Sequence, residues 1–326
     1  MLSIDDKTNN VVIDFQQITD ATDKNSFSFT KKDKDLVINH LYSKKSGGTI
    51  TIKDYFTEGL RSDLVYDVKY KNISVLGKNG TSHDLEKLLE LGINIIGEYD
   101  KDYNCTGYLG TSNNDVFTHK SGSAEIFGGD GDDIYNVDIN KSNTYIFDGA
   151  GKLQPNNDGN NTLNINERKG NLALVFNVNK DGKVDSADSI DINEIYISGH
   201  ELFIFNKKSL TLNNLMNYFL KEKTFNGVIE IDDYFGDDSD MTQSGSVYSE
   251  NEYVYLETIN TKEKKGSYSK VDMDSWINQV ASEVADWLNN KGYDSTADVI
   301  DKSFVTENTS DINSLLKVYQ TGYYQG

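Results

Sequence analysis

Short runs in which apolar and polar residues alternate recur along the first part of the chain. They fall at residues 10–15, 26–29, 36–38 and 49–52, and polar turn clusters separate them. Alternation with a period of two is typical of β-strands with one buried face, and strands at this spacing favour antiparallel sheets. The first 75 or so residues are therefore predicted to form strands.

The spacing of apolar residues becomes helical in two places. Leu85, Leu88 and Leu89 share one face of a predicted helix at residues 84–91. Near the C-terminus, apolar residues recur at steps of three and four in two runs: Ile277, Val280, Ala281, Val284 and Leu288, and then Ile312, Leu315, Leu316 and Tyr319. Such steps place side chains on one helix face, so a small helical unit is expected to close the chain.

A nine-residue pattern occurs twice. Residues 48–56 (Gly-Thr-Ile-Thr-Ile-Lys-Asp-Tyr-Phe) match residues 227–235 (Gly-Val-Ile-Glu-Ile-Asp-Asp-Tyr-Phe) at six positions. Two related β modules would then flank the segment between them, although both copies could also be similar ends of unrelated hairpins. Because the aromatic pair and the preceding aspartate match together, we favour shared ancestry.

Composition narrows the classes of function. The chain has 32 Lys and Arg against 52 Asp and Glu, and the resulting net charge of −20 argues against binding to nucleic acid or to an anionic membrane surface. Cys105 alone cannot form an internal disulfide, and no apolar run is long enough to predict a transmembrane segment. The N-terminus lacks the basic start and apolar stretch of a secretory signal peptide.

The most specific motif lies at residues 128–136, Gly-Gly-Asp-Gly-Asp-Asp-Ile-Tyr-Asn, which fits the calcium-binding nonapeptide pattern of parallel β-rolls. Residues 110–118 lie two nine-residue units earlier in the same phase, whereas the unit between them has Ala124 in place of the aspartate. Calcium accepts roughly six to eight oxygen ligands in flexible geometry. The predicted metal ligands are Gly110, Ser112, Asp115, Gly128, Asp130 and Asp133. A solvated Asp/Gly-rich loop is the alternative interpretation.

Residues 177–188 form a second candidate calcium site. Oxygen-bearing side chains occupy positions 1, 3, 5, 9 and 12 of this segment and Gly182 occupies position 6, as in an EF-hand loop. The predicted ligands are Asn177, Asn179, Asp181, Lys183, Asp185 and Asp188. Asp188 replaces the usual glutamate, and residues 172–176 favour a strand where an EF-hand has a helix, so an ordinary Asn/Asp-rich turn is the alternative.

Catalytic motifs are incomplete. His200 and Glu201 lack the second histidine of the metalloprotease H-E-x-x-H motif, and residues 110–114 lack the closing glycine of a nucleophile elbow. The protein is therefore predicted not to be an enzyme.

Together these residues resemble the RTX (repeats-in-toxin) family of proteins secreted by Gram-negative bacteria. The resemblance rests on the nonapeptides and on a flanking segment that contains the 48–56 pattern; it covers about residues 30–165, with a shorter match at 195–235. It implies a β-roll that folds outside the cell on meeting calcium, and a C-terminal signal for type I secretion. The protein would be secreted or lie on the bacterial cell surface, with calcium ions, the type I secretion machinery and a host cell surface as partners.

The predicted fold is mainly β: a calcium-binding parallel β-roll flanked by two related antiparallel β modules, with a small α-helical C-terminal unit. The expected domains are a β module with one helix (1–96), a short β-roll (97–165), a second β module with the EF-hand-like loop (166–245) and a helical unit that would hold the secretion signal (246–326). The predicted function is the calcium-binding C-terminal region of a secreted RTX-type toxin. A cell-surface adhesin or surface-layer module, and the non-catalytic tail of an exported hydrolase, are the alternatives.

Overall fold

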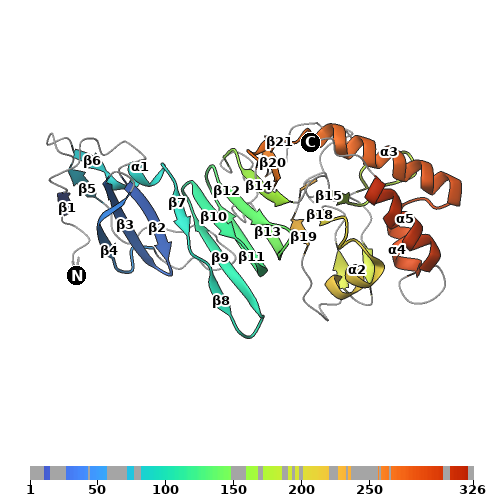
Figure 1. Cartoon of the computed structure of the whole chain (residues 1–326), viewed down its shortest axis with the longest axis horizontal. Coiled ribbons are helices and arrows are strands. Elements are labelled where there is room, and N and C mark those ends of the chain that lie inside the picture. Colours follow the sequence, from blue (N-terminus) through green and yellow to red (C-terminus); the bar gives the residue numbers. More distant parts are fainter. Residues whose placement is uncertain are drawn as a thin grey trace, which may run out of the picture.

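The computed structural model shows a mainly β protein, as the sequence predicted. It describes residues 11–14, 27–42, 45–56, 72–76, 82–147, 159–167, 172–185, 190–192, 195–197, 201–219, 227–232, 234–235, 256, 258–263, 266–303 and 309–321. The molecule is elongated in Figure 1, with the strands following one another from the N-terminal end and the longest helices at the other end.

The larger sheet has nine strands in the described residues. Their order is β21 (Ser269–Lys270), β20 (Thr258–Glu263), β14 (Thr162–Glu167), β12 (Ile134–Asp138), β10 (Asp115–His119), β7 (Ile93–Ile95), β2 (Phe27–Lys32), β3 (Asp35–Tyr42) and β4 (Lys45–Ile52). From β20 to β2 all neighbours are parallel, whereas β2, β3 and β4 pair antiparallel, as do β20 and β21.

The smaller sheet has seven strands in the same part of the chain. Their order is β15 (Leu172–Val175), β18 (Leu202–Asn206), β19 (Val228–Ile231), β13 (Ser142–Phe147), β11 (Gly122–Gly129), β9 (Cys105–Thr111) and β8 (Glu98–Asp100). The strands β19, β13, β11 and β9 are parallel; β8 pairs antiparallel with β9, and β15, β18 and β19 form an antiparallel meander.

Two small sheets complete the strands. They are β1 (Val11–Asp14), β5 (Ile73–Leu76) and β6 (Ser82–Asp84), and the hairpin β16 (Ile190–Ile192) with β17 (Ile195–Ile197). The expectation of antiparallel sheets in the first 75 residues is confirmed for β2, β3 and β4 but is wrong for β1 and β5, which are parallel. Residue alternation shows that a strand has a buried face, but it carries no information about the direction of a partner 62 residues away.

Between residues 105 and 167 the chain alternates between the two large sheets. Each of the strands β9 to β12 pairs in parallel with the strand two places further along the chain, so the chain winds in stacked coils. Apolar side chains fill the space between the sheets: Phe117 and Tyr135 stack with ring centres 5.1 Å apart, and Tyr108 meets Phe117 edge-on at 6.4 Å. This aromatic ladder fixes successive coils in one register, which also aligns their turns.

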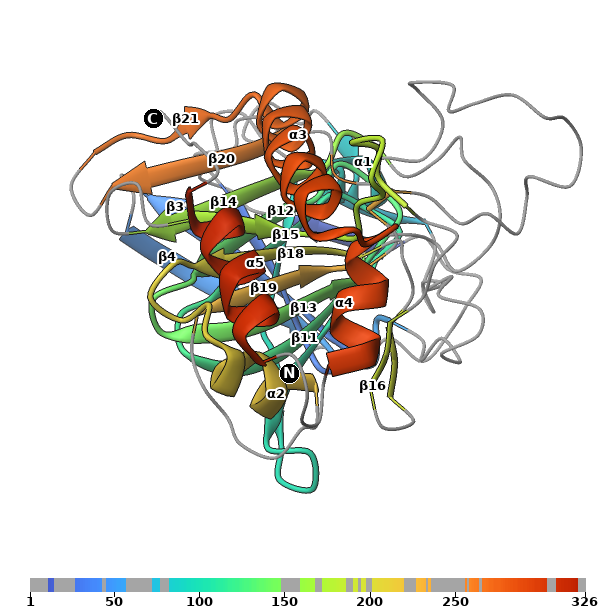
Figure 2. The same cartoon turned by 90° about the vertical axis from the view of Figure 1, so that its right-hand side faces the viewer.

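The described helices are α1 (Leu85–Leu89), α2 (Leu212–Phe219), α3 (Met273–Lys291), α4 (Thr296–Ser303) and α5 (Thr309–Thr321). The side chain of Asp272 accepts a hydrogen bond from the Ser275 main-chain N–H and caps α3, and Gly292 ends that helix with a left-handed φ of 80°. The predicted helices at 84–91, 277–288 and 312–319 are confirmed. Figure 2 shows α3, α4 and α5 lying across the end of the sheets.

The duplicated sequence pattern belongs to two three-stranded units with the same register. We call β2, β3 and β4 with the Tyr55–Phe56 pair the first module, and β15, β18 and β19 with the Tyr234–Phe235 pair the second module. Leu36 is opposite Ile52 in the first module, and Leu202 is opposite Ile231 in the second.

The aromatic pairs of the two modules also have the same geometry. The rings of Tyr55 and Phe56 are 5.0 Å apart at an interplanar angle of 86°, and those of Tyr234 and Phe235 are 5.1 Å apart at 86°. An edge-on arrangement of this kind lets one ring's positive edge face the other's negative face. The two modules therefore share main-chain pairing and the packing of their closing aromatic residues.

Candidate metal centre

Two turns stack along one edge of the coils. The first turn, residues 110–115, joins β9 to β10, and the second turn, residues 128–133, joins β11 to β12. A Cβ atom on Gly110 would lie 1.7 Å from the carbonyl oxygen of Gly128, and one on Gly129 would lie 2.2 Å from that of Thr111. Only glycine permits this approach, so the motif glycines are required for the carbonyl groups of the two turns to stack.

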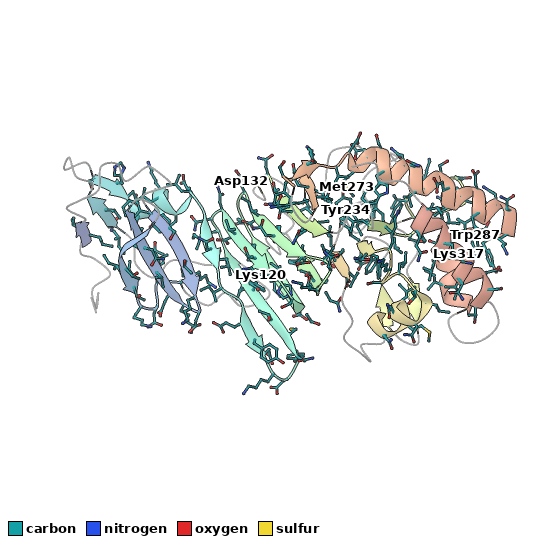
Figure 3. The ribbon with its side chains drawn as sticks, viewed as in Figure 1. Lys120, Asp132, Tyr234, Met273, Trp287 and Lys317 are labelled. Atoms are coloured by element: carbon teal, nitrogen blue, oxygen red, sulfur yellow. The ribbon has the colours of Figure 1, made fainter. Side chains whose placement is uncertain are left out.

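A ladder of side-chain to main-chain hydrogen bonds links the turns. The main-chain N–H of Asp115 donates to Oδ1 of Asp133 at 2.8 Å, and the N–H of Asp133 donates to Oδ1 of Asn161 at 2.7 Å. A second ladder runs beside it, from Asp132 N to Asn114 Oδ1 at 2.9 Å and from Asn160 N to Asp132 Oδ1 at 2.8 Å. In Figure 3, Asp132 marks the edge of the coils along which these turns lie.

The ladder reveals a third turn that the sequence interpretation missed. Asn161 lies 28 residues after Asp133, whereas Asp133 lies 18 residues after Asp115, so a search with a nine-residue period cannot find it. The signal that could have found it is a glycine followed by two Asx residues, which occurs at residues 131–133 and again at 159–161.

The carboxylate of Asp115 is wholly buried in the first turn. Its two oxygens accept hydrogen bonds from the main-chain N–H and the hydroxyl of Thr111. Burial raises the pKa of Asp115 well above its usual range, although the Thr111 hydrogen bonds and the nearby Lys31 ammonium act in the opposite direction. The Lys31 ammonium donates to the carbonyl oxygen of Leu109 at 2.8 Å.

The second turn contains a buried oxygen without a hydrogen-bond donor. Oδ1 of Asp130 is buried and accepts no hydrogen bond from the described residues, and burial raises the pKa of this carboxyl. Asp133 and Gly128, in the same turn, are also buried, whereas Ser112 of the first turn is exposed. The structure thus brings Gly110 against Gly128 and Asp115 against Asp133, places Asp130 in the second turn, and leaves Ser112 at the surface.

In the candidate loop at 177–188, two side chains already have protein partners. Oδ1 of Asn177 accepts hydrogen bonds from the Thr296 hydroxyl at 2.6 Å and the Ala297 main-chain N–H at 3.1 Å, so it holds the start of α4. Oδ1 of Asn179 accepts from the N–H groups of Asp181 and Lys183 at 3.0 and 3.1 Å. A cation at this loop would have to compete with these donors for both amide oxygens.

The remaining predicted ligands of the loop are spread out. Asp181 and Lys183 are exposed, Asp185 is half-buried, and Asp188, like His200, lies outside the described residues. The loop is attached to the helices by Asn289, whose side-chain amide donates to the carbonyl of Lys180 at 2.9 Å. The contacts of Asn177 and Lys180 thus dock the C-terminal helices, whereas those of Asn179 close the loop on itself.

Nothing in the described residues brings three or more His, Cys, Asp and Glu side chains close enough together to hold a metal ion. A cation in the stacked turns would therefore depend on main-chain carbonyls as well as carboxylates. No family model, curated protein or solved structure matches the chain. Among the helices that the structure describes, none has the length and apolar character needed to cross a lipid bilayer.

Proposed function

We propose that the chain is the calcium-binding, non-enzymatic region of a secreted RTX-type bacterial protein, which folds on meeting calcium after type I export. The observation that carries this proposal is the buried Oδ1 of Asp130, which accepts no hydrogen bond from the residues that the structure describes, in a turn that only glycines allow to stack. A buried carboxylate oxygen without a donor is costly, and a bound cation would compensate this cost.

The donors in the second turn suit calcium. They are the carboxylates of Asp130 and Asp133 and the carbonyl groups of stacked glycines, with no Cys or His among residues 128–133. Hard oxygen donors in an irregular arrangement match calcium better than zinc, which prefers nitrogen and sulfur, or magnesium, which needs a near-ideal octahedron. The residues present therefore fit the ion.

The coil geometry supports a β-roll, because parallel strands alternate between two sheets and their turns align. Calcium that binds only the aligned turns would stabilise only the folded chain, by about 2.7 kcal/mol at a concentration 100 times the Kd. Folding would then begin where calcium is abundant, outside the cell. The α3 to α5 unit would lie beside the signal read by the type I secretion machinery.

Adhesion at a cell surface is the second candidate. The β8–β9 hairpin projects from the body of the molecule in Figure 1, and near its tip Tyr99 and Tyr103 are 60% and 78% exposed. Tyrosines that present a rigid ring and a polar tip are favoured in protein interfaces. This role would place the protein on the bacterial surface, with a host cell as partner.

The calcium proposal is tested by far-UV circular dichroism and calorimetry during a calcium titration. We expect the wild type to gain β signal and thermal stability, and an Asp130→Asn, Asp133→Asn double variant to lose at least tenfold in calcium affinity. Asp286→Asn, on the exposed face of α3, removes a similar charge away from the turns and serves as the matched control. A wild type whose spectrum and melting temperature do not respond to calcium would overturn the proposal.

A further inference from the structure

The two modules differ at one buried position of their first strands. In the first module Lys31 is opposite Leu36, and the shared register places Phe176 at the equivalent position of the second module. Both side chains contact the second residue of the aromatic pair: the Lys31 ammonium is 5.9 Å from the centre of the Phe56 ring, and the ring of Phe176 is 5.4 Å from that of Phe235. A lysine thus occupies a place that the other module fills with an apolar ring.

The extra length and charge of Lys31 are directed to the residue of β9 that precedes the first turn. Its side chain is buried, at 7% exposure, and its ammonium donates to the carbonyl oxygen of Leu109 at 2.8 Å. Two residues further along β9, the main-chain N–H of Thr111 donates to the wholly buried carboxylate of Asp115, so the ammonium and the carboxylate bind neighbouring groups of the same strand. A carbonyl oxygen and a carboxylate are also the ligands that a metal cation in such a turn would bind.

We propose that the Lys31 ammonium is a built-in cation for the first turn. It supplies the positive charge that Asp115 needs, so the first turn requires no metal and calcium binding is confined to the second turn. A lysine is a compact cation with three donors, and its burial is tolerated only where it has partners of this kind. The calcium part rests on the proposed function, whereas the pairing of Lys31 with Asp115 does not.

The pairing is tested without calcium, in a chelator, by a double-mutant cycle on the full chain. Lys31→Met keeps a long apolar stem without the charge, and Asp115→Asn keeps the shape without the charge. We expect each single change to raise the unfolding equilibrium constant, and the rise in the double variant to fall short of the product of the two single rises by at least tenfold. Independent effects that multiply would overturn the pairing.

Failure of Lys31→Met to fold would not prevent this test, because the same change can be made in the Asp115→Asn background. Recovery of folding there would show that the unpaired Asp115 carboxylate causes the defect, whereas a chain that still fails to fold would show that Lys31 is needed for packing and would overturn the proposal. Lys31→Arg, which keeps the charge, serves as the matched control and should keep most of the coupling to Asp115.

Confinement of calcium to the second turn is tested by calorimetry. Asp115→Asn should leave the calcium affinity within about threefold of the wild type, whereas Asp130→Asn should lower it at least tenfold. Equal losses in the two variants would make Asp115 a metal ligand and overturn the role of Lys31 as its cation. If the wild type itself binds no calcium, the proposed function fails, and the cycle in chelator still decides whether Lys31 serves the first turn.

Discussion

The first and second modules have the same internal structure but attach to the coils by opposite edges. In the first module, β2 pairs in parallel with β7 and so joins the N-terminal end of the larger sheet. In the second module, β19 pairs in parallel with β13 and so joins the smaller sheet. The same three-stranded unit can therefore join parallel strands through its first strand, as in the first module, or through its third strand, as in the second module.

The comparison separates residues that define the module from residues that adapt it. The defining residues occupy equivalent positions in the two modules and are apolar in both. Leu36 and Leu202 are one such pair of equivalent residues, and both are fully buried. Adapted positions include Thr51, whose equivalent in the second module is Glu230. β15 is the outer strand of the smaller sheet, and α5 covers it, as Figure 2 shows. The Tyr319 hydroxyl of α5 donates to the carbonyl of Phe176 at 2.6 Å.

The largest expected effect comes from truncating the matched core residues. Leu36→Ala and Leu202→Ala should each lower the free energy of unfolding by about 2–5 kcal/mol, because both leucines are fully buried and alanine leaves a cavity. Denaturant unfolding followed by circular dichroism measures the change, with Asn278→Ala on the exposed face of α3 as control. A cost below about 1 kcal/mol in one module only would show that the two units are not equivalent in packing.

The next effect is a pH dependence of the free energy of unfolding, which arises from the second module and has no equivalent at Thr51 of the first. Burial, together with repulsion from Glu201 and Asp232, raises the pKa of Glu230 from 4.5 to about 8. The folded state then binds the proton more tightly than the unfolded state, so stability is greatest below about pH 4.5 and falls as the pH rises towards 8. Glu230→Thr, which installs the residue of the first module, should remove this fall, worth about 2–4 kcal/mol.

Unfolding free energies between pH 5 and pH 9, in chelator so that calcium binding does not contribute, measure this difference. Glu98→Gln, which changes an exposed carboxylate on β8, is the control and should leave the pH dependence unchanged. A Glu230→Thr variant that follows the wild type across this range would show that Glu230 is ionised in the folded protein at neutral pH.

Local periodicity was sufficient to predict the strands and helices that have one buried face. The alternation at 36–38 and 49–52 predicted β3 and β4, and the three- and four-residue steps predicted α3 and α5. The in-phase nonapeptides put Asp115 and Asp133 at the same position of their units, and in the structure the N–H of Asp115 contacts the side chain of Asp133. These features depend on neighbours that are close in sequence or related by a fixed period.

Contacts between distant segments could not be predicted in this way. Asn177 binds Thr296 across 119 residues, and no local pattern identifies that partner. The short helix α4 owes its start to this contact as well as to its own sequence, and the search for apolar repeats did not find it. The placement of Lys31 beside the first turn is similar, because it follows from the parallel pairing of β2 with β7.

The smallest expected effect distinguishes the tyrosines of the two aromatic pairs. The hydroxyl of Tyr55 is buried and has no hydrogen-bond partner among the described residues, and Tyr55 is fully buried whereas Tyr234 is 6% exposed. Because a buried polar group without a partner carries a desolvation cost, Tyr55→Phe should leave stability unchanged or raise it by up to about 1 kcal/mol. Tyr234→Phe should give no gain, and thermal unfolding of both variants measures the difference. A loss above about 1 kcal/mol in Tyr55→Phe would mean that this hydroxyl is hydrogen-bonded in the folded protein.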